Sequence, residues 1–191
     1  MSVVEKVEDP GDDADLKDMY ERLAQGGLGL GVLNIFKVVA HNPALLRNWA
    51  RLGTTMLTGG IVLSPRLREL AILRVGQLSG SEYEFGQHIR IAGTVGISYD
   101  EMAALQDYAD SDTFSELERA VLAYVDAAAR LDADAADRAR DLKRWLSDRE
   151  LVELSMCVGY WGLVARILVP LEVELDEALM GELPAEWREW M

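Results

Sequence analysis

A succession of helix-start signals constrains the fold of this chain more than any other feature. Asn42-Pro43 and Ser64-Pro65 each place a capping side chain directly before a proline, which fits the first position of a helix. Three Ser-x-x-Glu capping boxes follow, beginning at Ser98, Ser115 and Ser147. Apolar residues follow these signals at helical spacing, and alternating strand-like runs do not occur. The pattern predicts an all-α fold, a single domain of about eight to ten helices.

The composition suits one domain with a large core and narrows the set of partners. The chain has 191 residues, half of them hydrophobic, and a formal net charge of −14. Such a charge repels phosphate backbones and anionic membranes, so we expect no nucleic-acid partner and no membrane partner. No basic segment followed by an apolar block opens the chain, and the longest apolar runs end short of a membrane span. We therefore expect a cytoplasmic protein.

The distribution of charge and glycine divides the chain into parts. Residues 1–11 are charged and predict a flexible N-terminal arm, residues 12–178 hold the helical domain, and residues 179–191 form a short C-terminal tail. The glycines within 25–31 predict a flexible connection and not a phosphate loop, because no strand precedes them and no Lys-Ser/Thr follows.

Two segments near the C-terminus are apolar enough to be buried or to form an interface. Leu151–Leu168 predicts a core or interface helix that Pro170 closes. Trp187 and Trp190 lie on a short amphipathic segment of the tail. Both segments offer apolar surface for contacts between copies of the chain.

The segment from Pro65 to His88 carries the candidate chemistry. It predicts two helices joined by a glycine-containing turn, with Glu69 on the first helix and Glu84 on the second. Glu84 and His88 are four residues apart and so lie on one helix face, with Ser81 one turn earlier. A carboxylate beside an imidazole can fix its tautomer and raise its basicity. These residues predict a proton-transfer site.

Structural interpretations stay open for several of these residues. A lone histidine on a half-buried helix is more often a packing residue, and Glu69 can instead pair with Arg66 or Arg68. His41 stands at a His-Asn-Pro helix boundary, and Cys157 lies in an apolar helical stretch, where a buried inert thiol is expected. No His/Cys/Asp cluster has the spacing of metal ligands, so we expect neither a metal nor a cofactor.

Glu69, Ser81, Glu84 and His88 together resemble the motif of the carboxymuconolactone decarboxylase-like family, which also contains the AhpD-type alkylhydroperoxidases. In the redox branch of that family the motif reads Glu-x11-Cys-x2-Cys-x3-His. Glu69 and His88 match it, whereas Ser81 and Glu84 stand at the two cysteine positions. Further similarity extends over residues 12–178. It is carried by His41-Asn-Pro-Ala-Leu-Leu, Ser64-Pro-Arg-Leu-Arg-Glu-Leu, Phe114-Ser-Glu-Leu-Glu-Arg-Ala and Ser147-Asp-Arg-Glu-Leu-Val-Glu-Leu.

This resemblance implies an AhpD-like helical bundle, a homo-oligomer (dimer, trimer or hexamer) and a small-molecule substrate. Disulfide-based peroxidase chemistry needs an attacking thiolate and a resolving thiol, which Ser81 and Glu84 cannot supply. The chain therefore fits the non-redox side of the family, with 4-carboxymuconolactone decarboxylase. We predict a cofactor-free decarboxylase or isomerase-type enzyme that acts on a small lactone or carboxylic acid by Glu/His proton transfer.

The predicted catalytic residues have distinct roles in this hypothesis. His88 delivers a proton to carbon, Glu84 orients His88, and Glu69 completes the relay. Ser81 donates a hydrogen bond to a substrate oxygen.

Three arginines, Arg74, Arg90 and Arg166, are candidates for binding a substrate carboxylate. Three alternatives to the lyase hypothesis stay open. They are a thiol peroxidase that uses Cys157 with an external reductant, an AhpD-like relative that has lost the cysteine pair, and a non-catalytic oligomeric helical module.

Overall fold

The computed structural model describes residues 2–26 and 29–191, which form helices, turns and bends and no strand. The all-α prediction is therefore confirmed for this part of the chain. The α-helices are α1 (Ala14–Gly26), α2 (Asn34–Val39), α3 (Pro43–Leu57), α4 (Pro65–Ser79), α5 (Glu82–Thr94), α6 (Tyr99–Ala104), α7 (Glu116–Arg130), α8 (Ala135–Leu142), α9 (Asp148–Leu168) and α10 (Glu177–Met180). Two short 3₁₀ helices are η1 (Leu105–Asp107) and η2 (Trp187–Trp190).

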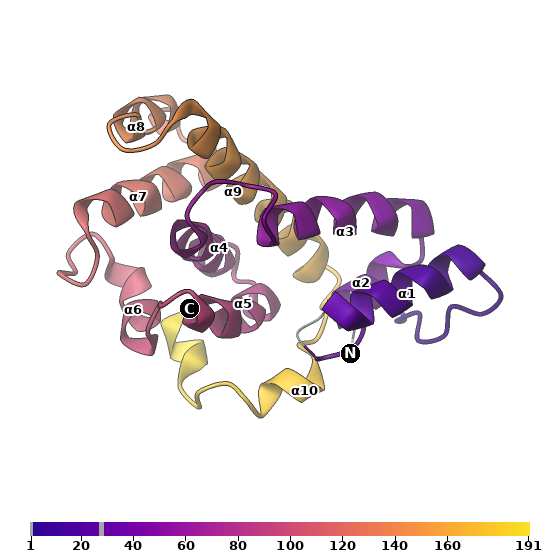
Figure 1. Cartoon of the computed structure of the whole chain (residues 1–191). Coiled ribbons are helices and arrows are strands. Elements are labelled where there is room, and N and C mark those ends of the chain that lie inside the picture. Colours follow the sequence, from indigo (N-terminus) through magenta and orange to yellow (C-terminus); the bar gives the residue numbers. More distant parts are fainter. Residues whose placement is uncertain (1, 27–28) are drawn as a thin grey trace.

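Helix α4 is the central element of the fold. It packs against α5, α7 and α9, which surround it in Figure 1. Residues Leu67 to Leu73 are all buried, so the helix is enclosed on every side and does not have a single apolar face. Polar side chains on α4 therefore lie in the interior, where they require a partner.

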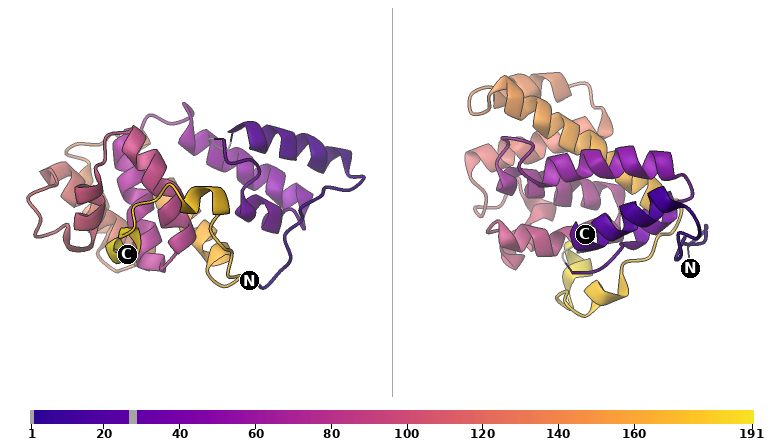
Figure 2. Two further views of the ribbon diagram at one scale, coloured as in Figure 1. Left: turned by 90° about the horizontal axis from the view of Figure 1, so that it is seen from below. Right: turned by 45° about the vertical axis from the view of Figure 1, so that its right-hand side comes forward.

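Helices α1 to α3 extend to one side of the remaining helices (Figure 2). They have a small core of their own, to which Leu16, Met19, Tyr20, Ala40 and Leu46 contribute. Helix α3 also contacts α9, so the N-terminal helices form a wall beside the centre of the bundle.

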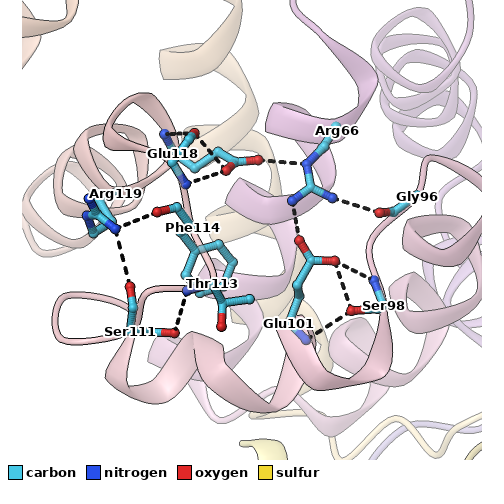
Figure 3. Close-up of polar contacts among 10 residues, drawn as sticks. Arg66, Gly96, Ser98, Glu101, Ser111, Thr113, Phe114, Glu118 and Arg119 are labelled. Carbon is cyan, nitrogen blue, oxygen red and sulfur yellow. Dashed lines mark hydrogen bonds and ion pairs between the residues drawn. The ribbon is translucent and has the colours of Figure 1, made fainter.

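The two capping boxes at the starts of α6 and α7 are linked by one arginine. In both boxes the serine accepts from the glutamate N–H and the glutamate accepts from the serine N–H, as the sequence predicted for Ser98/Glu101 and Ser115/Glu118. Arg66 of α4 donates to the carboxylates of both glutamates, with 2.6 Å between its Nε and Glu118 Oε1 (Figure 3). The first turns of two helices are thereby fastened to the central helix.

Helix α9 is the apolar helix that the sequence predicted over Leu151–Leu168, and it begins at Asp148, directly after its N-cap Ser147. In the described part of the chain it is the one helix that is long and apolar enough to cross a membrane, with a mean hydropathy of 1.5, by length and composition only. It packs on α4 and α7 as a core helix, while Val152, Met156 and Leu163 are exposed on its outer face. The expected homo-oligomer stays a prediction.

The C-terminal tail packs onto the core and does not present its tryptophans as an outer surface. Trp187 and Trp190 are buried, and the Trp187 ring stacks on Phe85 with 6.5 Å between ring centroids. Gln77 donates to the backbone carbonyl of Trp190. The expectation that this tail offers an apolar surface to another copy is therefore wrong.

The N-terminal segment contains no helix over residues 2–11, and Met1 lies outside the described residues. It is hydrogen-bonded to the body of the protein at Val3 and Val7, which donate to the carbonyls of Leu171 and Lys37. Of the predicted flexible connection at 25–31, residues 27 and 28 lie outside the described residues.

Candidate active site

The turn between α4 and α5 brings the motif residues together. Gly80 closes α4 with φ of 61°, in the left-handed region that favours glycine. A Cβ on Gly76 would lie 3.3 Å from the backbone nitrogen of Phe85, which shows how closely the two helices approach. The hairpin places Glu69 of α4 opposite His88 of α5, although eighteen residues separate them.

A chain of hydrogen bonds joins Arg68, Glu69, His88 and Trp161. Arg68 Nε donates to Glu69 Oε1 over 2.8 Å, and His88 Nδ1 lies 2.7 Å from Glu69 Oε2. Trp161 of α9 donates from Nε1 to His88 Nε2 over 2.9 Å. The exposed fractions of Arg68, Glu69 and His88 are 6%, 0% and 6%, so these hydrogen-bonded side chains are almost fully buried.

These contacts fix the tautomer of His88. The indole N–H of Trp161 can only donate, so Nε2 accepts and the ring hydrogen lies on Nδ1, facing Glu69. Burial by itself raises the pKa of Glu69, but attraction to His88 and Arg68 and their hydrogen bonds outweigh it and lower the pKa. Glu69 is therefore held as a carboxylate.

Arg68 connects this chain to the wall of the site. Its Nη1 donates to the carbonyls of Met56 and Leu57, at 3.2 and 3.3 Å, in the last turn of α3. These carbonyls lack partners within their own helix, so the guanidinium acts as a side-chain cap. Arg68 thus both holds the last turn of α3 in place and supplies the positive charge beside Glu69.

Glu84 is the unusual member of the group. Its side chain is 2% exposed, and neither carboxyl oxygen receives a hydrogen bond from any described residue. Burial raises the pKa of Glu84 well above its usual range, because nothing nearby compensates the lost hydration of the charged form. Burial therefore favours the neutral, protonated form of Glu84.

The structure corrects the division of roles predicted from the sequence. The carboxylate that orients His88 is Glu69 and not Glu84, because it is Glu69 that lies against Nδ1. Ser81 is the N-cap of α5, where its hydroxyl accepts from the N–H of Glu84 over 3.4 Å. Ser81 is absent from the described residues that line the cavity below, so no role in substrate contact follows from its position.

A cavity of about 1010 Å³ opens beside this group, between the N-terminal helices and the faces of α5 and α9. Glu84 and His88 line its inner end. A row of ring contacts runs along it from α2 to His88, formed by Phe36, Trp49, Tyr160 and Trp161. The cavity is thus largely aromatic and aliphatic, with few polar groups, as expected of a small-molecule site.

The arginines selected from the sequence do not line this cavity in the described structure. Arg74 is bound to Asp126, Arg90 pairs with Glu182 at 3.4 Å, and Arg166 donates to the carbonyl of Gly162. Arg166 lines a separate cavity of about 720 Å³ between α7 and α9, away from Glu84 and His88.

The sequence analysis missed Trp49, Trp161 and the cavity arginines, which are Arg22, Arg47 and Arg51. Trp161 follows His88 by 73 residues, and no spacing rule links residues so distant on different helices. From the sequence alone, a tryptophan in an apolar helix is expected to be a core residue, and arginines are expected to be surface residues. Only the packing of α3 and α9 around α5 brings them to the site.

Cys157 lies close to the same group, but its thiol is buried. It is 1% exposed, and burial followed by the negative charge of Glu69 raises the pKa of its thiol well above the usual value. Among the described residues, no three His, Cys, Asp or Glu side chains gather in a way that could hold a metal ion.

Comparison with known proteins places the chain among relatives of this fold. Residues 43–127 match the model of the carboxymuconolactone decarboxylase family. No curated protein sequence matches the chain. A variant of the debrominase Bmp8 in complex with 2,3,4-tribromopyrrole superposes with a TM-score of 0.75 at 20% identity, covering 95% of this chain and 97% of the debrominase.

Two further solved structures share the fold at low sequence identity. An uncharacterised peroxidase-related protein from Silicibacter sp. TM1040 has a TM-score of 0.75 at 18% identity, covering 94% of each chain. An alkylhydroperoxidase AhpD core protein from Ralstonia eutropha JMP134 has a TM-score of 0.66 at 18% identity, covering 96% of each. The resemblance inferred from the sequence is thus confirmed: this is an AhpD-like all-helical chain whose residues 43–127 match the carboxymuconolactone decarboxylase family.

Proposed function

We propose that this protein is a cofactor-free, cytoplasmic proton-transfer enzyme of the decarboxylase or isomerase type. Its substrate is a small lactone or carboxylic acid that binds in the cavity beside Glu84 and His88. The group that performs the chemistry consists of Glu69, His88 and Glu84.

One observation carries this proposal. A buried carboxyl group, Glu84, lines an apolar cavity without a hydrogen-bond partner in the described structure, one helical turn from an imidazole held in a fixed tautomer. A buried polar group without a partner destabilises the fold, and a catalytic role is one of the reasons for which proteins retain such a group. Titratable groups perturbed by burial beside a cavity are candidates for acid–base chemistry.

The chemistry needs only what these side chains provide. In the decarboxylation of a γ-carboxy unsaturated lactone, the carbon–carboxylate bond breaks and carbon dioxide leaves. The electron pair is delocalised into the lactone carbonyl, and a proton is then added to carbon. The protein has to hold the lactone, stabilise the delocalised charge and supply one proton, which requires acid–base groups in a cavity shielded from water.

The cavity suits a cyclic molecule with oxygen atoms. Its aromatic row offers flat surfaces for an unsaturated ring. Trp49 lines the cavity, and its indole N–H finds no acceptor among the described residues. Arg22, Arg47 and Arg51 also line the cavity, the first two paired with Asp18 and Asp15. These groups favour a ligand with carbonyl or carboxylate oxygens.

The positions of the remaining residues do not favour thiol peroxidase chemistry. Ser81 and Glu84 occupy the cysteine positions of the redox motif, and the thiol of Cys157 is buried with a raised pKa. A peroxidase would need an accessible thiolate.

Proton transfer to carbon can be tested by incubating the protein with 4-carboxymuconolactone, and with a panel of small unsaturated lactones and acids, in D₂O. We expect release of carbon dioxide or incorporation of deuterium at carbon, observed by proton NMR, with at least one compound. His88→Ala should abolish it without unfolding the protein. His41→Ala is the matched control, because His41 is exposed and lies outside the cavity. Absence of exchange across the panel, or equal exchange in His88→Ala, would refute the proposal.

A further inference from the structure

Hydrogen bonds engage both ring nitrogens of His88. Nδ1 lies against Glu69, and Nε2 accepts from the indole N–H of Trp161. To deliver a proton from Nε2, the imidazole would need a hydrogen where the Trp161 hydrogen already points. Two donors cannot face each other, so the bond to Trp161 would have to break first.

Packing holds Trp161 in that position. The indole is 3% exposed, and its ring meets His88 edge-on, with 5.5 Å between centroids and 84° between planes. The ring of Tyr160 packs against it from the other side along the helix, with 5.0 Å between centroids. The indole that holds His88 is therefore part of the buried core and not of a surface segment.

Glu84 has the opposite environment. Its carboxyl lines the cavity, and no described residue donates to either oxygen. The titratable groups that line the cavity with it are Arg22 on α1, Arg47 and Arg51 on α3, Tyr83 and His88 on its own helix and Tyr160 on α9, and Cys157 of α9 interacts with it electrostatically. Arg22 and Arg47 are paired with Asp18 and Asp15, and Arg68, Glu69 and His88 are bonded to one another, so none of these groups is hydrogen-bonded to Glu84. Burial thus favours the protonated carboxyl, whose hydrogen has no acceptor among the described residues.

Resting on the proposed function, we propose that Glu84 donates the proton to the molecule bound in the cavity, and that His88 is a positioning residue held between Glu69 and Trp161. The ligand atom that meets Glu84 is a carbon that gains a proton, after the bond to a carboxylate breaks, carbon dioxide leaves and the electron pair stays on the ligand.

The step balances without a further reactant. The O–H bond of Glu84 breaks as the new C–H bond forms, which leaves Glu84 as a carboxylate. A proton from water, entering through the open side of the cavity, then restores the neutral acid. A buried carboxylate is unfavourable here, so reprotonation is strongly driven.

The neutral state of Glu84 can be tested without a substrate. A carboxyl whose pKa is higher in the folded than in the unfolded protein stabilises the fold least at high pH. Its contribution is complete below the unfolded value, about 4.3, and falls as the pH rises towards the raised folded value. Across this window we expect the unfolding equilibrium of the native protein to shift about tenfold per pH unit relative to Glu84→Gln.

Urea unfolding from about pH 5 to pH 9 measures this difference. Glu82→Gln is the matched control, because Glu82 is on the same helix but is exposed and pairs with Arg188. It should follow the native pH dependence. If Glu84→Gln also follows it, the neutral-acid assignment is wrong.

Turnover separates the roles of the two residues. With the compound that exchanges deuterium, Glu84→Gln should lose at least a hundredfold in rate, and Glu84→Asp should recover part of it. Native activity should fall at high pH as Glu84 ionises. His88→Asn should be slower but should keep this alkaline fall at the same pH.

Each outcome has a distinct consequence. If His88→Asn removes the alkaline fall while Glu84→Gln retains activity, His88 is the donor and the inference is overturned. If no compound exchanges deuterium although the unfolding test shows a neutral Glu84, the proposed function fails, and with it the donor role. If exchange occurs but the unfolding test shows a charged Glu84, the proposed function stands and only the inference fails.

Discussion

Replacing Glu69 with glutamine removes one negative charge from the interior while preserving the size of the side chain. Glu69 is fully buried and accepts hydrogen bonds from Arg68 and His88 through different oxygens. A glutamine has one amide oxygen, so it can accept from only one of these donors. Its NH₂ group then faces the other donor, and the guanidinium of Arg68 stays charged without a neighbouring carboxylate.

The expected loss is large because the buried guanidinium of Arg68 loses its counter-charge. Removing one member of a buried, hydrogen-bonded ion pair costs about 3–5 kcal/mol in the free energy of unfolding. With a urea slope of about 2–3 kcal/mol per molar, this loss lowers the urea midpoint by about 1–2.5 M. Urea unfolding followed by tryptophan fluorescence at neutral pH measures it. Glu82→Gln, on the exposed face of α5, should change the free energy of unfolding by no more than about 0.5 kcal/mol.

A second substitution tests the cause of this loss. In the double variant Arg68→Met/Glu69→Gln both charges are absent, and the remaining amide oxygen can still accept from His88. We expect the double variant to be more stable than Glu69→Gln alone by about 1 kcal/mol or more, because replacing a whole buried pair costs less than breaking it. If Glu69→Gln lowers the midpoint no more than Glu82→Gln does, or if the double variant is the less stable of the two, the buried ion pair does not stabilise the fold as argued.

Two further predictions concern the walls of the site and its scaffold. Gly53→Ala would place a Cβ 2.4 Å from the hydroxyl of Tyr160 on α9, so we expect the free energy of unfolding, measured by heat or urea, to fall by about 1–3 kcal/mol. Gly93→Ala has open space around it and should leave the stability unchanged or raise it. Equal effects of the two substitutions would contradict the close packing of α3 on α9. Burial alone raises the pKa values of Glu101 and Glu118, but the hydrogen bonds of these carboxylates to Arg66 and to the serine caps outweigh burial and lower both pKa values. The two carboxylates therefore stabilise the fold above about pH 4.3, and this stabilisation is lost as the pH falls through the lowered pKa values. Arg66→Met should therefore cost about 1–2 kcal/mol at neutral pH and progressively less in acid, measured by urea unfolding as a function of pH; a cost independent of pH would refute the electrostatic origin.

Local signals in the sequence were sufficient for most of the secondary structure. The serine–glutamate boxes, the Asn42-Pro43 start and the glycine at position 80 act within a few residues of chain, so they could be read directly and the helices begin where they predict. The motif residues Glu69, Glu84 and His88 could be selected for a similar reason, since each lies on a helix face that the periodicity defines.

The contacts among those residues were decided by tertiary packing. Helical spacing suggested that Glu84 orients His88, since they share a face, yet the partner of the imidazole is Glu69 on the neighbouring helix. A rotation or shift of α4 along α5 by a few ångströms would change that pairing without altering any local pattern. Trp161 reaches the site only because α9 crosses the hairpin at this level.

The sequence by itself therefore determined an all-helical fold and the residue types available for proton chemistry, because helix periods and caps are local properties. The tertiary structure decided which acid has its charged form stabilised and which has its neutral form favoured. Glu69 and Glu84 are the same amino acid on adjoining helices, and the sequence does not distinguish them. Arg68 and His88 surround one with donors, whereas packing buries the other beside an apolar cavity, and these environments move their pKa values in opposite directions.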